Sequence, residues 1–222
     1  MIRSVLSVSA ALAVSVGLLL TACGGAGSGG NDKIQPSAAG TTGTTTSPSS
    51  IPSPTRTSGL AAPGFDLPSD ITVDFRGFVS SDPKKQAVLT DATYAAKSVL
   101  EFEAMTYTKE TPNFKRFWTG LHGAQFADSI ISQGKDGSVI TGLYSFYKPV
   151  VKFIAAGNVS VRYCEDQRKA YAKDARTGRV KVTTPSLSDF HLWTLLMKKG
   201  PAGDWQVFDH AWVKGAKQCE VA

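Results

Sequence analysis

The apolar residues between positions 82 and 133 follow the period of an α-helix. One stripe contains five of them at spacings of three and four: Val88, Ala92, Ala95, Val99 and Phe102. Ser81-Asp82-Pro83 precedes this stripe, and an aspartate cap followed by a proline is typical of a helix start. The pattern predicts a helix over 83–107, a short helical segment over 114–118, and a helix over 120–133 that ends at Gly134.

After residue 138 apolar residues alternate with polar ones, which is the period of a β-strand. The alternation predicts strands over 139–147, 150–155, 159–165, 169–174, 179–183, 190–198 and 205–213, and a short strand over 71–75 precedes the helices. Residues 174–178 and 200–203 are typical of reverse turns. Helices followed by an antiparallel meander predict an α+β domain.

The first 22 residues have the layout of a secretory signal. A basic start at Arg3 is followed by an apolar run of roughly 15 residues and then by small residues, which is too short for a spanning helix. The run closes with Leu20-Thr21-Ala22-Cys23, which resembles the lipobox of bacterial lipoproteins. The resemblance implies that Cys23 is joined to diacylglycerol and palmitate and anchors the exported protein to the outer face of the cell membrane. The alternative is an ordinary signal cleaved near Ala22.

A tether follows the signal. Residues 23–63 begin with the lipidated cysteine and continue as a Gly/Ser/Thr/Pro-rich linker. This composition buries too little apolar surface to offset the entropy of ordering, so we expect a disordered, flexible segment. Residues 64–222 are long enough to form one globular domain with its own core.

The chain carries a net charge of +6, but its lysines and arginines are scattered rather than arranged in a stripe with interleaved aromatic residues. We therefore predict no nucleic-acid binding. A solvated basic surface and an attraction to anionic lipid head groups or wall polymers are the two interpretations of this charge. The sequence contains no phosphate-cradling glycine loop, serine elbow or zinc signature, and no cofactor is predicted.

Two cysteines remain once Cys23 is assigned to lipid. In an exported chain, Cys164 and Cys219 predict a disulfide, and two buried free thiols are the alternative. Chain-entropy models give roughly 4 kcal/mol for closing so long a loop. No metal site is predicted, because Cys-x-x-Cys and His-x-x-x-His spacings are absent from the sequence.

The order of these elements resembles the nuclear transport factor 2-like, or SnoaL-like, superfamily over roughly residues 82–214. The resemblance includes a closing pattern, Asp204-Trp205-Gln206-Val207 after a turn, and the lipobox and linker resemble those of actinobacterial lipoproteins. It implies a long N-terminal helix and shorter helices packed on a curved antiparallel sheet, as a cone whose mouth holds a small apolar ligand. It also implies dimerisation through the open sheet face, and a disulfide that pins the C-terminal tail onto the sheet.

Candidate pocket residues lie first on the predicted long helix. Asp91 and Tyr94 are three positions apart and share a face of the helix. This face either lines the pocket or is a wet, solvent-exposed edge, and the wet edge is favoured. Aromatic residues are the other pocket material, although core packing explains most of them equally well. The aromatic candidates are Trp118, Tyr144 and Tyr163.

The last two strands supply the remaining candidates. Because neighbouring strand residues point to opposite faces, Asp209 and His210 are not expected to face the pocket together. Asp189 and His191 can share a face, and His191 can meet Asp209 or His210 if the two strands are neighbours. A histidine beside an aspartate suits acid–base chemistry near neutral pH, whereas a structural hydrogen-bonded pair or a solvated rim pair is the alternative and is favoured.

Two functions are compatible with this sequence. The first, which we favour, is a non-catalytic, lipid-anchored binding or interaction module of the cell envelope, whose partner is a small apolar ligand, a second copy of the chain or another envelope protein. The second is a small isomerase, cyclase or dehydratase acting in the same pocket, and it rests on fold analogy. A buried carboxylate with a raised pKa facing a cavity would favour the enzyme.

Overall fold

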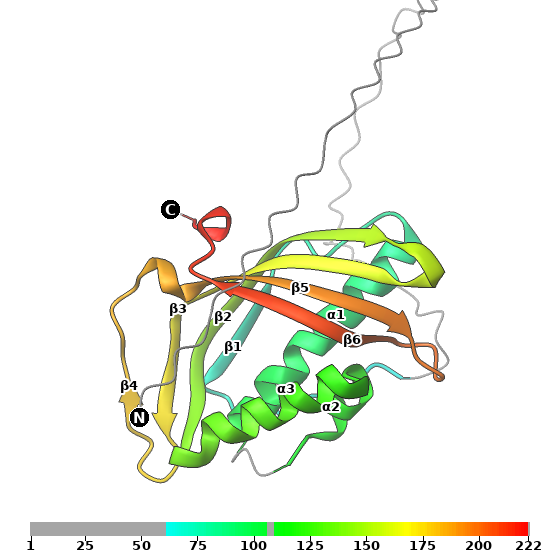
Figure 1. Ribbon diagram of the computed structural model, residues 1–222. Coiled ribbons are helices and arrows are strands. Elements are labelled where there is room, and N and C mark those ends of the chain that lie inside the picture. Colours follow the sequence, from blue (N-terminus) through cyan, green and yellow to red (C-terminus); the bar gives the residue numbers. More distant parts are fainter. Residues whose placement is uncertain (1–60, 106–108, 222) are drawn as a thin grey trace, which may run out of the picture. The chain divides into compact units, whose positions relative to one another are not determined.

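A twisted, curved β-sheet is the framework of the protein in a computed structural model (Figure 1). The structure describes residues 61–105 and 109–221. Its strands are β1 (Ile71–Phe75), β2 (Ser138–Phe153), β3 (Val159–Asp174), β4 (Val180–Lys181), β5 (Phe190–Lys199) and β6 (Trp205–Lys214). The strand order is β1-β2-β3-β5-β6, with β4 paired to β3. The predicted α+β class is confirmed, but the sheet is not wholly antiparallel, because β1 pairs with β2 in parallel.

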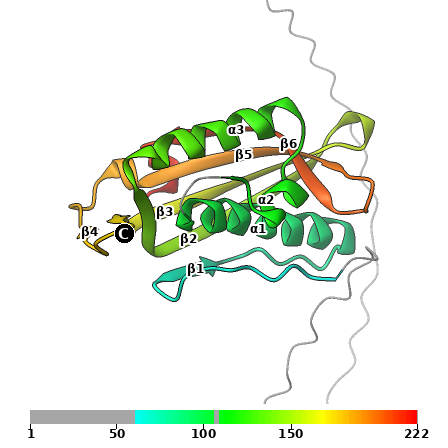
Figure 2. The same ribbon diagram turned by 90° about the horizontal axis from the view of Figure 1, so that it is seen from below.

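Three α-helices pack on one face of this sheet (Figures 1 and 2). They are α1 (Pro83–Ala104), α2 (Pro112–Phe117) and α3 (Gly120–Gln133). Asp82 caps α1 by accepting hydrogen bonds from the amides of Lys84 and Lys85, as the sequence predicted. Short 3-10 helices follow at η1 (Gly134–Asp136), η2 (Ala155–Gly157), η3 (Leu187–Asp189) and η4 (Lys217–Cys219).

The long strands β2 and β3 each replace two predicted strands. In β2 the predicted break at residues 148–149 is a bulge, since the pairing with β3 shifts between Tyr147 and Val150. Lys148 there has a positive φ of 53°, and Pro149 lacks the amide hydrogen that a ladder needs. The strand bends at this point and continues.

Gly142 on β2 lies close against the backbone of β3. Its φ is +100°, and a Cβ atom added there would lie 2.1 Å from the carbonyl oxygen of Lys169. Only glycine fits such a position, so the curvature of β2 depends on this residue.

Two apolar clusters lie on opposite faces of the sheet. The larger one fills the space between the helices and the sheet and includes Phe102, Phe114 and Leu195. The smaller one joins Tyr147, Phe190 and the C-terminal segment on the other face. Most of the chain's aromatic residues belong to these two clusters, so their role in the core is sufficient to explain their presence.

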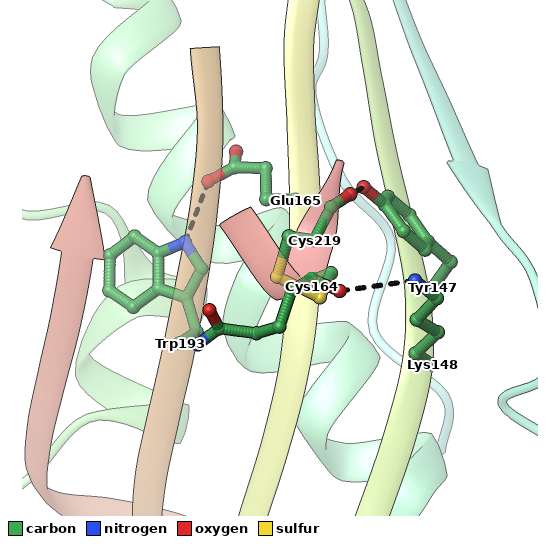
Figure 3. Close-up of a disulfide and its surroundings, with 7 residues drawn as sticks. Tyr147, Lys148, Cys164, Glu165, Trp193 and Cys219 are labelled. Carbon is green, nitrogen blue, oxygen red and sulfur yellow. Dashed lines mark hydrogen bonds between the residues drawn. A yellow bond between two sulfur atoms is a disulfide. The ribbon is translucent and has the colours of Figure 1, made fainter. Parts of the chain in front are cut away.

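The predicted disulfide is confirmed within the smaller cluster. Cys164 on β3 is bonded to Cys219 of η4, with Cα atoms 5.3 Å apart (Figure 3). The Tyr147 hydroxyl donates a hydrogen bond to the carbonyl of Cys219, and the Lys148 ammonium donates to that of Gln218 at 3.1 Å. The C-terminal segment is thus fixed to the outer face of the sheet.

The predicted signal peptide, the lipidated Cys23 and nearly all of the linker lie outside the described residues. In the part of the chain that the structure describes, every helix is too short or too polar to cross a membrane.

Candidate functional site

A cavity of about 660 Å³ lies between α3 and the last strands of the sheet. One stripe of α3 forms one wall, with the side chains of His122, Gln125, Phe126, Ser129 and Gln133. The floor is provided by β5 and β6, by two residues of β2 and by one residue each of α1 and β3. Cavities of this size hold small organic molecules.

All three histidines of the chain line this cavity, although they are far apart in the sequence. His122 comes from α3, His191 from β5 and His210 from β6. Glu103, at the C-terminal end of α1, and Asp209 on β6 add two carboxyl groups. The fold therefore gathers titratable side chains that no sequence motif connects.

Glu103 is half-buried and faces the cavity. Burial, and then the negative charge of Glu165, raise the pKa of the Glu103 carboxyl from 4.5 to about 8. The side chain is therefore protonated at neutral pH and can donate a hydrogen bond to a bound molecule.

Glu165 lies behind the cavity floor and is 3% exposed. It accepts a hydrogen bond of 2.6 Å from the indole nitrogen of Trp193 (Figure 3). The Nδ1 atom of His191 lies 3.4 Å from the same carboxylate, and its Nε2 atom lies 3.1 Å from the carbonyl oxygen of Ser188. Both histidine nitrogens therefore lie near acceptor oxygens. The Glu165 carboxylate lies close to Glu103, and its hydrogen bond fixes the orientation of Trp193.

Asp209 and His210 both line the cavity, so the expectation that they cannot face it together is wrong. β6 is the edge strand of the sheet, and a bulge lies directly before these residues: Leu196 pairs with Asp209 and Met197 with Val207, which leaves Phe208 without a partner in the register. From there the Asp209 carboxylate reaches back to α3, where its oxygen lies 2.6 Å from Nδ1 of His122.

His210 stands among aromatic rings. Its ring centroid lies 4.4 Å from that of Phe126 and 5.2 Å from that of Trp118. Burial lowers the pKa of His210, while Asp209 raises it and His122 lowers it. The Nδ1 atom is buried and has no hydrogen-bond partner among residues 61–105 and 109–221. A neutral imidazole satisfies these surroundings better than a charged one, because a neutral ring leaves one nitrogen without a proton to donate.

Four of the eight candidate pocket residues line the cavity: Tyr144, His191, Asp209 and His210. The register separates His191 from Asp209 and His210, because His191 pairs with Lys214 and His210 with Leu195. His191 contacts Glu165 instead, which the sequence did not predict. Asp189 takes part in a capping box, accepting a hydrogen bond from the Ser186 amide at 2.6 Å.

The other four candidates are not among the residues that line this cavity. Asp91 is not on a wet edge either: it is 4% exposed and accepts a hydrogen bond from the Trp205 amide at 2.9 Å. Tyr94 packs against the rings of Phe65 and Phe117. The two remaining aromatic candidates, Trp118 and Tyr163, are core residues beneath the cavity, 5% and 3% exposed.

Sequence reasoning missed Glu103 and Glu165. One signal was present for Glu103, which lies four residues after Val99 and continues the apolar stripe of α1 with a carboxyl group. Glu165 offered no such signal, because its partners His191 and Trp193 come from another strand. Among the described residues, no cluster of three or more histidine, cysteine or acidic side chains is arranged to hold a metal ion.

No protein-family model and no curated relative matches the chain. Several solved structures are similar, and two of them illustrate how low the identity is. One is the intermembrane space region of the chloroplast protein ARC6, with 13% identity and a TM-score of 0.36, over 55% of this chain and 94% of that chain. The other is a ketosteroid isomerase-like protein from Shewanella frigidimarina NCIMB 400, with 12% identity and a TM-score of 0.31, over 63% of this chain and 99% of that chain. At TM-scores below 0.5, neither likeness carries an argument about function.

Proposed function

We propose that this protein is a lipid-anchored binding module of the bacterial envelope that holds a small molecule in the cavity between α3 and the sheet. The observation that carries the proposal is the cavity itself, where all three histidines, a half-buried carboxyl and two tryptophans meet. Polar groups gathered around a hollow usually serve a ligand, because the same groups facing a filled core would be costly. The mixed lining suits a molecule with both apolar and hydrogen-bonding parts.

The binding proposal is tested by native mass spectrometry of the mature protein, exported into an oxidising compartment and purified without refolding. We expect a bound small molecule on the wild type. Ser129→Trp places a large side chain on the cavity wall and should abolish the bound mass. Ser132→Trp, on an exposed position of α3 that does not line the cavity, is the matched control and should retain it. Bound mass that persists in Ser129→Trp would refute binding at this site.

Acid–base catalysis is the second candidate, and the raised pKa of Glu103 favours it. A carboxyl group that titrates at about pH 8 can both give and accept a proton near neutral pH. An isomerase, cyclase or dehydratase would use Glu103 as this group, with the Glu165–His191 pair positioning the cavity floor. Glu103→Gln keeps the shape of the protonated acid but transfers no proton. If the protein is an enzyme, Glu103→Gln should carry a ligand of different mass from the wild type; identical masses would exclude this role.

Anchoring through Cys23 and membership of the nuclear transport factor 2-like superfamily belong to the same proposal. Their support is the lipobox with its apolar run, and a helix followed by a curved sheet of long hairpins. Cys23→Ala should release the protein from the membrane, and the intact mass should lose its lipid. Retention of Cys23→Ala in the membrane fraction would exclude the anchor. The same native spectra distinguish a monomer from a homodimer or a complex with another envelope protein.

A further inference from the structure

The acidic side chains around the cavity each have a hydrogen-bonding partner or a proton of their own. Glu165 receives a hydrogen bond from Trp193 and lies beside His191. Asp209 pairs with His122. Glu103 holds its own proton at neutral pH. These carboxyl groups are therefore engaged within the protein.

Lys214, by contrast, brings a positive charge without a partner. It lies at the outer end of β6, is exposed, and lines the cavity. No ion pair or hydrogen bond joins its ammonium group to another residue in the part of the chain that the structure describes. In the register of the sheet it lies opposite His191, which also lines the cavity. The electrostatic field at this mouth therefore attracts anions.

Beside Lys214, two tryptophans form an aromatic surface. The rings of Trp193 and Trp212 are stacked, with centroids 6.1 Å apart and an interplanar angle of 28°. Trp193 is held in place because its indole nitrogen donates a hydrogen bond to Glu165. Trp212 is 47% exposed, although it lines the cavity. An exposed indole face in a cavity is suited to stacking against a ring of a ligand.

We propose that the cavity binds a small, ring-bearing organic anion, with its ring on Trp212 and its acid group at Lys214. The polar side chains of Gln125 and Gln133 on α3 would contact the opposite edge of the molecule. This inference rests on the proposed function, and it narrows the ligand from any small molecule to one charge class and one shape.

Three probes of one shape and different charge test the inference: naphthalene-2-carboxylate, 2-naphthalenemethanol and 2-naphthylmethylammonium. Isothermal titration calorimetry on the mature, disulfide-bonded protein should rank the carboxylate first, about 10-fold tighter than the alcohol, and the ammonium last. Lys214→Gln should remove the advantage of the carboxylate and leave the affinity for the alcohol unchanged. Lys181→Gln, on an exposed position of β4 outside the cavity, is the matched control and should change neither. Trp212→Ala should weaken all three probes.

Equal affinity for the carboxylate and the alcohol, or preference for the ammonium, would overturn the inference. So would an advantage of the carboxylate that survives Lys214→Gln. Absence of binding by all three probes would overturn the assignment of a ring to Trp212. In each case the Ser129→Trp and Ser132→Trp pair still decides whether the cavity binds a ligand, so the failure of the inference is distinguishable from failure of the proposed function.

Discussion

The proton on Glu103 makes stability depend on pH in the direction opposite to that of an acid in a salt bridge. Its pKa is about 8 in the folded protein and close to 4.5 when the side chain is free in the unfolded chain. Between these values the folded state binds more protons than the unfolded state, so the free energy of unfolding falls as pH rises from 4.5 to 8. At 1.36 kcal/mol per pH unit, the full decrease is on the order of 5 kcal/mol. A change of that size is a large part of the stability of an ordinary domain.

Glu103→Gln should abolish this decrease, since glutamine has nearly the shape of the protonated acid and does not titrate. We expect the variant and the wild type to have similar unfolding free energies at pH 5, and the variant to be more stable by several kcal/mol at pH 8. Urea titrations of the mature protein followed by tryptophan fluorescence, at intervals between pH 5 and pH 8.5, measure both curves. Glu220→Gln, at an exposed position, is the control. Parallel curves for Glu103→Gln and wild type would refute the raised pKa.

Three further changes have expected outcomes. Cys164→Ser opens a loop between residues 55 positions apart and should cost roughly 4 kcal/mol, or about 10 °C in a non-reducing melting curve; an unchanged curve would show that the bond is dispensable. Gly142→Ala should destabilise the protein by about 3 kcal/mol or prevent folding, because the new Cβ atom meets the backbone of β3. Gly137→Ala, also at positive φ but in open space, is the control and should cost about 1 kcal/mol in urea titrations. Equal costs for the two variants would contradict the steric reason. In the wild type, the lowered pKa keeps the imidazole of His210 neutral in the folded state while it is protonated in the unfolded state, so stability falls as pH falls through 6.5. His210→Phe should remove this loss. If the unfolding free energies of variant and wild type, from urea titrations between pH 7 and pH 5, change with pH by the same amount, this role of His210 is excluded.

Local signals in the sequence predict the helices well because each one has its own end markers. Asp82 and Pro83 mark the start of α1, and Gly120 and Gly134 flank α3. The strands are less well predicted, because what looks like a gap between two strands is a bulge within one. Whether a chain turns back or continues at Lys148 depends on its pairing with β3, which is a long-range property.

The candidate site is less predictable than the fold for the same reason. Asp91 was nominated because it shares a helix face with Tyr94, yet that face packs against the start of β6, where Asp91 binds the Trp205 amide. Glu103 lies on the opposite end of the same helix, where α1 passes the cavity. A helical pattern shows which side chains share a face, but only packing shows which end of that face meets a hollow.

The acid–base character of the cavity arises from the residues packed around Glu103 rather than from any sequence motif. Glu103 retains its proton because it is buried and because the negative charge of Glu165 lies close to it. Trp193 and His191 in turn lie within reach of the Glu165 oxygens. These residues come from α1, β3 and β5, and β6 adds Asp209 and His210 to the same wall. A core that needed only stability would replace such groups by apolar ones of similar size, because buried charges are costly to maintain. Their convergence on one open hollow is therefore the strongest physical reason to assign this end of the sheet to a ligand.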